Sequence, residues 1–308
     1  MERTISTYGK LLLTGEYFVL NGALALAIPA RYGQQFIIKE SASTASIRWE
    51  SFDHQNQKWF EGYFNLNPLR VKESTDSAVA ERLLQIFTAL TQLNPESTFL
   101  KPGLSFQSYL EFPNNWGLGS SSTLIAALAQ WAAVNPYDLL AQTFGGSGYD
   151  LACAISDQPL LYQIQKDTRQ FVQVPFFPDF HDQLYFVFLN QKQNSREGIQ
   201  RYRTLVNPSE ADRRIVSQLT LDFLQAKDLK EFEAVMNEHE NFVATKLQLP
   251  KVKAQKFPDY WGAVKSLGAW GGDFVLATSS KSRDATVSYF KEKGLETVIP
   301  FADMMIVR

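Results

Sequence analysis

The sequence contains very little cysteine and histidine. Its one cysteine, Cys153, excludes an internal disulfide and a cysteine-rich zinc site, and we interpret it as a small buried apolar residue. The three histidines, His54, His181 and His239, share no metal-ligand spacing. A chain of 308 residues can bury a sizeable core without such cross-links.

Long apolar runs and a strong net charge are also missing. No apolar run approaches the ~20 residues that span a bilayer, and the N-terminal stretch MERTISTYGK has no apolar signal core. The formal net charge of −2 argues against a nucleic-acid groove or attraction to an anionic membrane. We therefore expect a cytoplasmic protein that binds neither nucleic acid nor membrane.

Hydrophobic residues make up 45% of the chain, and their spacing changes repeatedly along it. Helical spacing over 77–93 predicts a helix, whereas alternation over 104–112 predicts a strand. Strand and helix patterns follow one another without an internal repeat. This mixed order predicts an α+β fold with antiparallel sheets rather than a repetitive parallel array.

The strongest local signal is the glycine-serine loop at 117–122, which lies between the predicted strand 104–112 and a predicted helix at 123–134. Glycines allow close backbone approach, and the first amides of a helix are unpaired donors near a positive dipole end. Together they favour a phosphate site. A plain turn with serine caps is the alternative, and the loop is neither a Walker A motif nor a complete dinucleotide fingerprint.

Two further motifs place charged residues beside glycine turns. Lys10 and Glu16 flank the turn at Gly15, so Lys10 can offset charge on a phosphate with Glu16 as its ion partner, or the two can form an ordinary surface pair. Asp150 follows the glycines at 145–148 and can serve as a general base, or it can simply favour a helix start.

A fourth motif, at 266–273, is a glycine-rich turn between two apolar segments. The four motifs in this order resemble the GHMP kinases, a family that includes galactokinase, homoserine kinase, mevalonate kinase and phosphomevalonate kinase. The Gly-Glu-Tyr-x-Val-Leu-x-Gly segment at 15–22 resembles the mevalonate and phosphomevalonate branch more than the galactose branch. The segment Gly-Tyr-Asp-Leu-Ala at 148–152 is most similar to a bacterial Gly-Tyr-Asp-Ile-Ala subgroup.

The resemblance implies a two-part architecture, with an ATP-binding domain at 1–175 that resembles a ribosomal protein domain and a ferredoxin-like domain at 176–308. It also implies ATP and Mg2+ as cofactors, a small-molecule substrate, and roles for individual residues. Asp150 and Lys10 would be the catalytic residues, and Ser121 would bind the metal ion. Nucleotide binding would involve Gly117, Leu118, Gly119, Ser120, Ser121, Ser122, Gly271 and Gly272. Substrate binding would involve Glu16, Ser147, Gly148 and Ser195.

The sequence departs from the family pattern in two places. Trp270 and Asp273 interrupt the glycines of the fourth motif, and Asp273 would repel phosphates unless it faces magnesium or solvent. The position of a magnesium-binding glutamate is occupied by Leu139, with Asp138 beside it.

Several functions therefore stay open at this stage. Mevalonate is the first candidate acceptor and phosphomevalonate the second. A diphosphomevalonate decarboxylase, a nucleotide sensor without turnover and a partner-binding protein are the alternatives. A homodimer is compatible with the sequence but not required by it.

Overall fold

A computed structural model of the protein describes residues 2–40, 46–96, 100–166, 168–191, 195–270 and 272–306. The chain divides into two compact units. Unit 1 comprises Met1–Gly9, Tyr32–Asn114 and Leu118–Ile155, and unit 2 comprises Lys10–Arg31, Asn115–Gly117 and Ser156–Arg308.

Unit 1 is built on a mixed sheet. Its strands are β1 (Glu2–Leu12), β2 (Ala25–Glu40), β3 (Ile47–Phe52), β4 (Lys58–Leu66), β5 (Leu69–Ser74) and β6 (Leu104–Leu110), of which β1 and β2 continue into unit 2. The strand order is β5-β4-β3-β6-β2, with β1 beside β2. β3 and β6 run parallel, whereas the pairs β2–β6, β3–β4 and β4–β5 are antiparallel. In β6 every second residue is buried, as the alternation in the sequence predicts.

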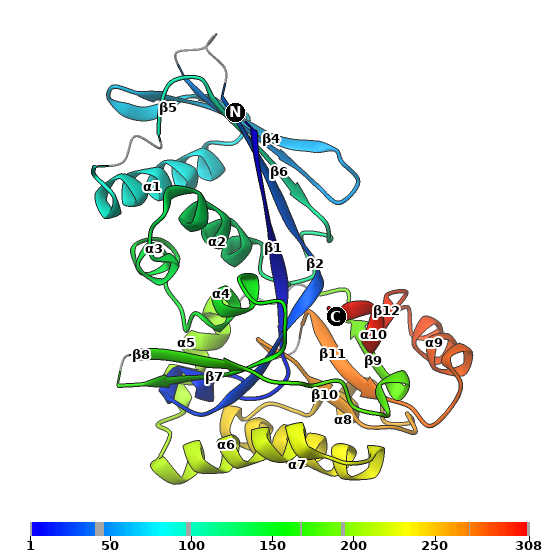
Figure 1. Ribbon diagram of the computed structural model, residues 1–308. Coiled ribbons are helices and arrows are strands. Elements are labelled where there is room, and N and C mark those ends of the chain that lie inside the picture. Colours follow the sequence, from blue (N-terminus) through cyan, green and yellow to red (C-terminus); the bar gives the residue numbers. More distant parts are fainter. Residues whose placement is uncertain are drawn as a thin grey trace. The chain divides into compact units, whose positions relative to one another are not determined.

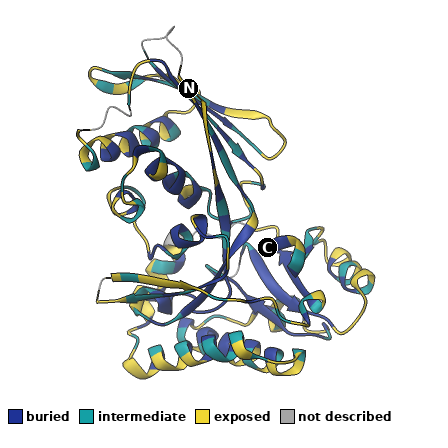
Figure 2. Ribbon diagram, in the orientation of Figure 1, coloured by how far each residue is buried: buried dark blue, intermediate teal, exposed yellow. Residues whose placement is uncertain are grey.

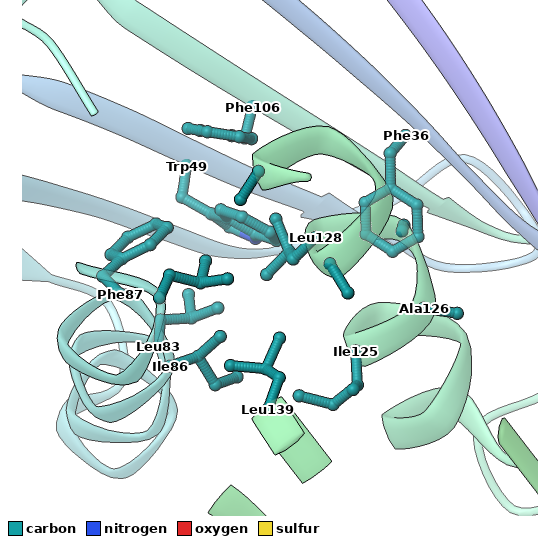
Figure 3. Close-up of a cluster of buried hydrophobic side chains, with 14 of the residues drawn as sticks. Phe36, Trp49, Leu83, Ile86, Phe87, Phe106, Ile125, Ala126, Leu128 and Leu139 are labelled. Atoms are coloured by element: carbon teal, nitrogen blue, oxygen red, sulfur yellow. The ribbon is translucent and has the colours of Figure 1, made fainter. Parts of the chain in front are cut away.

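Four helices pack against one face of this sheet: α1 (Ser77–Leu93), α2 (Ser120–Ala132), α3 (Pro136–Thr143) and α4 (Tyr149–Ala154). The predicted helix at 77–93 is confirmed. It begins there because the carboxylate of Asp76 accepts hydrogen bonds from the amides of Ala78 and Val79. In Figure 3 the aromatic side chains of Trp49 and Phe106 lie among apolar side chains from the helices.

Unit 2 contains two groups of strands. The first residues of β2 pair antiparallel with β7 (Leu160–Gln165), which pairs antiparallel with β8 (Thr168–Gln173). A second, fully antiparallel sheet has the order β10-β11-β9-β12. Its strands are β9 (Leu184–Phe188), β10 (Val264–Ser266), β11 (Phe274–Thr278) and β12 (Val298–Pro300). Every residue of β9 and β11 is buried (Figure 2).

The helices of unit 2 are α5 (Ser195–Leu205), α6 (Glu210–Gln225), α7 (Leu229–Leu247), α8 (Val252–Lys256), α9 (Arg283–Glu292) and α10 (Phe301–Met304). α6 begins with a capping box, in which Ser209 and Asp212 bond reciprocally to each other's backbone amides. Apolar residues of α6 and α7 join residues of the 17–23 segment in one buried cluster.

The α+β class predicted from the sequence is confirmed. The compact units divide the chain differently from the predicted domains 1–175 and 176–308, because 10–31 and 156–175 belong with the C-terminal half. The domain limits therefore stay a prediction. Among the described residues, no helix combines the length and the hydropathy needed to cross a membrane.

Candidate functional site

The glycine-serine loop is a tight turn that leads directly into α2. Gly117 and Gly119 have φ angles of 67° and 91°, in the left-handed region that favours glycine. Gly119 precedes the first turn of α2, to which Ser120 and Ser121 belong. The amides of this turn have no partner in a preceding turn, so they are available donors beside the positive end of the helix dipole. The loop therefore has the local structure of a phosphate-binding helix start.

The hydroxyls that follow differ in what they contact. Ser122 is buried, and its Oγ donates to the carbonyl oxygen of Gly119 at 2.7 Å. Thr123 Oγ1 donates to Oε1 of Gln34 at 2.7 Å. Ser121 is exposed, and its hydroxyl makes no hydrogen bond with another described residue. Of the predicted loop serines, Ser121 is thus the most exposed, while Ser120 is half-buried and Ser122 is buried.

The segment that contains Gly9 and Lys10, the N-terminal motif, contacts the glycine-serine loop in both units. In unit 1, Gly9 lies so close to the loop that a Cβ there would be 3.1 Å from the carbonyl oxygen of Leu118. In unit 2, Lys10 Nζ donates to the carbonyl oxygen of Gly117 at 2.9 Å. Residues more than a hundred positions apart in the sequence are therefore in contact within each unit.

The glycine-rich motif at 145–150, which ends in Asp150, forms the start of α4 in unit 1. Gly148 precedes the helix in a left-handed conformation with a φ of 89°, and Asp150 lies in the first turn. Asp150 is half-buried, whereas Ser147 is 7% exposed. Cys153, also in α4, is fully buried, as predicted.

Glu16 corrects one part of the sequence interpretation. Its predicted ion partner was Lys10, but its carboxylate forms an ion pair with Lys265, and both side chains are 0% exposed. Glu16 lies in the turn before the short 3-10 helix Phe18–Asn21 and its side chain is fully buried, whereas Lys10 precedes that turn on β1 and bonds to Gly117. A direct contact of Glu16 with substrate remains a prediction, and the observed position favours a structural role.

Two more titratable residues surround this ion pair. His239 Nε2 accepts a hydrogen bond from the amide of Gly15 at 3.0 Å and lies 3.3 Å from Glu16 Oε2. Glu240 accepts hydrogen bonds from the amide and the hydroxyl of Ser266, both at 3.0 Å. The sequence did not single out His239, Glu240 or Lys265, because nothing in their spacing relates them to residue 16.

Burial dominates the electrostatics of this cluster. It raises the pKa of Glu16 to about 7, against the opposing effect of Lys265. It also raises the pKa of Glu240 and holds the pKa of His239 well below its usual value, where Lys265 adds to the effect.

Tyr17 of the N-terminal motif bonds to the fourth motif. The sequence interpretation gave Tyr17 no role of its own. Tyr17 donates its hydroxyl to the carbonyl oxygen of Ala269 at 2.7 Å, and its ring stacks on Tyr202 of α5 with centroids 5.5 Å apart. Trp270 is 3% exposed and packs in the same apolar cluster. Gly272 is buried. Gly271 lies outside the described residues, as does the side chain of Ser195 at the start of α5.

Asp273, the departure in the fourth motif, lies against the glycine-serine loop. A Cβ on Gly117 would be 2.8 Å from Asp273 Oδ1 and closer still to the other two carboxyl atoms. Trp116, the residue before Gly117, packs edge-to-face on Phe274 at 5.5 Å. Asp273 and Phe274 are adjacent in sequence, so one short segment provides both contacts with the loop.

The residues present fit a magnesium-nucleotide site only in part. Ser121 offers an exposed hydroxyl, but Leu139 is fully buried in the apolar core of unit 1 and Asp138 beside it is exposed on the first turn of α3. No group of three or more His, Cys, Asp or Glu among the described residues could hold a metal ion by itself. Magnesium with few protein ligands, carried by a nucleotide, remains compatible with this donor set.

A cavity of about 430 Å³ in unit 2 lies apart from the motif residues. Its lining includes Phe176, Phe177 and Met305, and none of the predicted site residues.

The fold matches solved kinase structures over nearly the whole chain. A Streptococcus pneumoniae phosphomevalonate kinase in complex with phosphomevalonate and AMPPNP has a TM-score of 0.69 and 17% identity, covering 96% of this chain and 99% of that chain. Methanococcus jannaschii mevalonate kinase has a TM-score of 0.67 and 16% identity, covering 97% of both chains. Lactococcus lactis galactokinase, complexed with galactose, has a TM-score of 0.65 and 13% identity, covering 95% of this chain and 88% of that chain.

Sequence comparisons add nothing to this likeness. No family model matches the chain. No curated protein matches it either. At these identities the structural likeness concerns the fold, and the chain has the fold shared by mevalonate kinase, phosphomevalonate kinase and galactokinase.

Proposed function

We propose that the chain is an ATP-dependent phosphotransferase of the GHMP kinase family, which transfers the γ-phosphate to a small alcohol or phosphate. The contact between Lys10 and Gly117 carries this proposal, because it joins the lysine before the Gly15 turn to the first glycine of the glycine-serine loop. The shared kinase fold supports it.

Each motif residue has a role in the proposed reaction. Loop amides at the start of α2 would bind phosphate oxygens, and Lys10 would offset the charge that develops on them. The acceptor oxygen forms a bond to the γ-phosphorus as the bond to the bridging oxygen breaks and ADP leaves. With an alcohol acceptor, the hydroxyl proton passes to the carboxylate of Asp150. A magnesium ion bound with ATP would supply neutralising charge at the phosphates.

Mevalonate is the proposed acceptor, with phosphomevalonate second. The support is the Gly-Glu-Tyr-x-Val-Leu-x-Gly segment at 15–22 together with the fold shared with kinases of both substrates. One observation favours a second function: Leu139 is fully buried where a family carboxylate is expected, which suits a nucleotide sensor without turnover.

A screen of ATP consumption tests the proposal. The purified chain is given Mg-ATP with mevalonate, phosphomevalonate, homoserine or a hexose in turn, and diphosphomevalonate is added separately to detect carbon dioxide release. Consumption with mevalonate alone is the expected result. ATP binding without consumption of ATP for any acceptor would favour the sensor, and no ATP binding would contradict both.

A variant of Asp150 then tests the mechanism. Asp150→Ala should abolish turnover while nucleotide binding remains, because the carboxylate acts on the acceptor and not on the phosphates. Asp138→Ala is the matched control, since Asp138 is an exposed carboxylate in the first turn of the neighbouring helix α3. Near-normal turnover in Asp150→Ala would show that Asp150 is not the general base.

A further inference from the structure

A buried group of titratable side chains joins two segments of unit 2, the turn at 14–17 and the segment at 266–270. Its members, here called the Glu16 cluster, come from the turn, from β10 and from α7: Glu16, Lys265, His239 and Glu240. Lys265 forms the ion pair with Glu16, and Glu240 binds the amide and the hydroxyl of Ser266, the next residue along β10. All four side chains are at most 2% exposed, so the two segments are connected through groups that solvent hardly reaches.

The charges of the Glu16 cluster do not balance when both carboxylates are ionised. One ammonium, on Lys265, faces two carboxylates, on Glu16 and Glu240. His239 adds no positive charge at neutral pH, because burial and the ammonium of Lys265 hold its pKa well below the usual value. A net negative charge in a buried site is costly, and it disappears when one carboxylate takes up a proton.

Glu16 is the carboxylate better placed to take up this proton. Its Oε1 is bound by Lys265, whereas its Oε2 has no hydrogen-bond partner among the described residues. Both oxygens of Glu240, by contrast, accept hydrogen bonds from Ser266. A proton on Glu16 Oε2 therefore displaces no existing bond. Burial, with a smaller effect from the like charge of Glu240, raises the pKa of Glu16 to about 7.

The two segments that the cluster joins also carry backbone strain. Tyr17, which follows Glu16, has a φ of 61°, and Trp270 has a φ of 51°. Bulky residues rarely adopt these left-handed angles, which persist only where the surrounding structure holds them. Tyr17 and Trp270 pack in one apolar cluster, and the hydroxyl of Tyr17 bonds to Ala269. A strained contact thus lies directly beside a carboxylate that titrates.

We infer that the Glu16 cluster is a proton-sensitive latch that holds the turn at 14–17 against the segment at 266–270. With one proton bound, the cluster is neutral and the latch is closed. Loss of that proton to solvent leaves two carboxylates facing one ammonium, and their repulsion loosens the contact between Tyr17 and Ala269. The closed form is favoured below about pH 7 and is lost as the pH rises through that value. This inference goes beyond the proposed function and requires neither nucleotide nor acceptor.

Fluorine NMR of the chain labelled with fluorotryptophan tests the latch without any ligand. Trp270→Phe identifies the signal of Trp270 among those of the six tryptophans. In a pH titration this signal should shift with a midpoint of about 7, the pKa of Glu16. The difference between its positions in light and heavy water should grow above the midpoint, because Trp270, which is 3% exposed in the closed latch, gains contact with solvent.

Variants of the carboxylates assign the transition. In Glu16→Gln it should be lost, because the amide does not titrate and the cluster stays neutral. In Glu240→Gln the midpoint should fall by about one pH unit or more, because the like charge that opposes ionisation of Glu16 has been removed. Glu238→Gln removes an exposed carboxylate from the same helix, α7, and as the matched control it should keep the original midpoint.

A Trp270 signal that does not titrate in the unmodified chain would overturn the inference, as would a transition that survives in Glu16→Gln. A shift with no change in the difference between light and heavy water would also contradict the latch, since the charge would then change without opening it. If circular dichroism showed that Glu16→Gln does not fold, Glu240→Gln would decide, because an unchanged midpoint there contradicts the unbalanced charge.

Discussion

The two units differ in how completely they bury paired charges. In unit 1 the interior cluster around Trp49, Phe87 and Phe106 is apolar. In unit 2, by contrast, Glu16 and Lys265 are fully buried as an ion pair, with His239 beside them. An apolar core accepts many residues of similar volume, whereas a buried charge requires its partner. Unit 2 should therefore be far less tolerant at these few positions.

Removal of the buried cation should have the largest effect. Lys265→Met leaves the carboxylate of Glu16 without its partner and should lower the free energy of unfolding of unit 2 by about 3–5 kcal/mol. Hydrogen exchange of amides in β10 and β11 measures this loss locally, with amides of β6 in unit 1 as the internal control.

The double variant Glu16→Gln/Lys265→Met separates lost charge compensation from lost packing. It should recover most of the stability, because neither charge remains buried. A double variant no more stable than Lys265→Met would show that the loss is one of packing, and that the contrast between the units is not electrostatic.

A cavity in unit 1 should have a somewhat smaller effect. Leu128→Ala removes a fully buried side chain from α2 and should cost about 2–5 kcal/mol in the free energy of unfolding. Leu124→Ala in the same helix is the control, since Leu124 is only half-buried and should cost less. Urea titration measures the free energy of unfolding of both variants. Equal losses in Leu128→Ala and Leu124→Ala would argue against a close-packed core at Leu128.

The burial of Glu16 in unit 2 also predicts a pH dependence of stability. Glu16 has a pKa of about 7 in the folded chain, above its usual 4.5, so the folded state holds the proton more tightly. Its contribution to stability is fully present below about 4.5 and is lost as the pH rises through about 7. His239, with its pKa lowered, acts in the opposite direction below its usual 6.5.

Comparison with Glu16→Gln isolates this effect. The stability of the variant relative to the original chain should increase between pH 4.5 and about 7, since the amide does not titrate. Thermal unfolding at several pH values measures the difference. A difference independent of pH would show that Glu16 does not titrate in this range.

The smallest effect should come from the charged surface of unit 1. Glu61 accepts hydrogen bonds from Lys58 and Arg48, which lower its pKa to about 2. Stability from this group is present above its usual 4.5 and is lost as the pH falls through about 2. Glu61→Gln should cost at most about 1 kcal/mol at neutral pH, because Lys58 and Arg48 are partly exposed.

Added salt provides the check on this surface network. Screening should shrink the cost of Glu61→Gln, whereas the cost of Lys265→Met should change little because its partner is fully buried. Equal salt sensitivity in the two variants would remove the distinction between the surface charges of unit 1 and the buried charges of unit 2.

Periodic elements were the most predictable part of the fold. The helix at 77–93 follows from its apolar spacing, and Asp76 fixes its start. α2 begins at Ser120 rather than at the predicted 123, since the loop serines themselves form its first turn. β8 and β10 were not predicted, because β8 is mostly polar and exposed and β10 has only three residues.

The candidate site was predictable as a set of motifs but not as a set of contacts. The sequence interpretation placed Lys10 near the transferred phosphate without naming a partner in the loop, and the bond from Lys10 to the carbonyl oxygen of Gly117 comes from the structure. The sequence interpretation predicted Lys10 as the ion partner of Glu16, and this prediction was wrong. The observed partner, Lys265, is 249 positions away, and such a distant pair leaves no pattern in local spacing. Tyr17 was missed for the same reason, since its bond to Ala269 also joins distant segments.

The sequence by itself determined the α+β class, the glycine turns and the presence of a helix after the glycine-serine loop, because these depend on local spacing and on backbone conformations that glycine permits. Only the tertiary structure decided which charges meet. It buried Glu16 with Lys265 and brought Asp273 to Gly117, because pairing between distant charges depends on how the strands and turns pack.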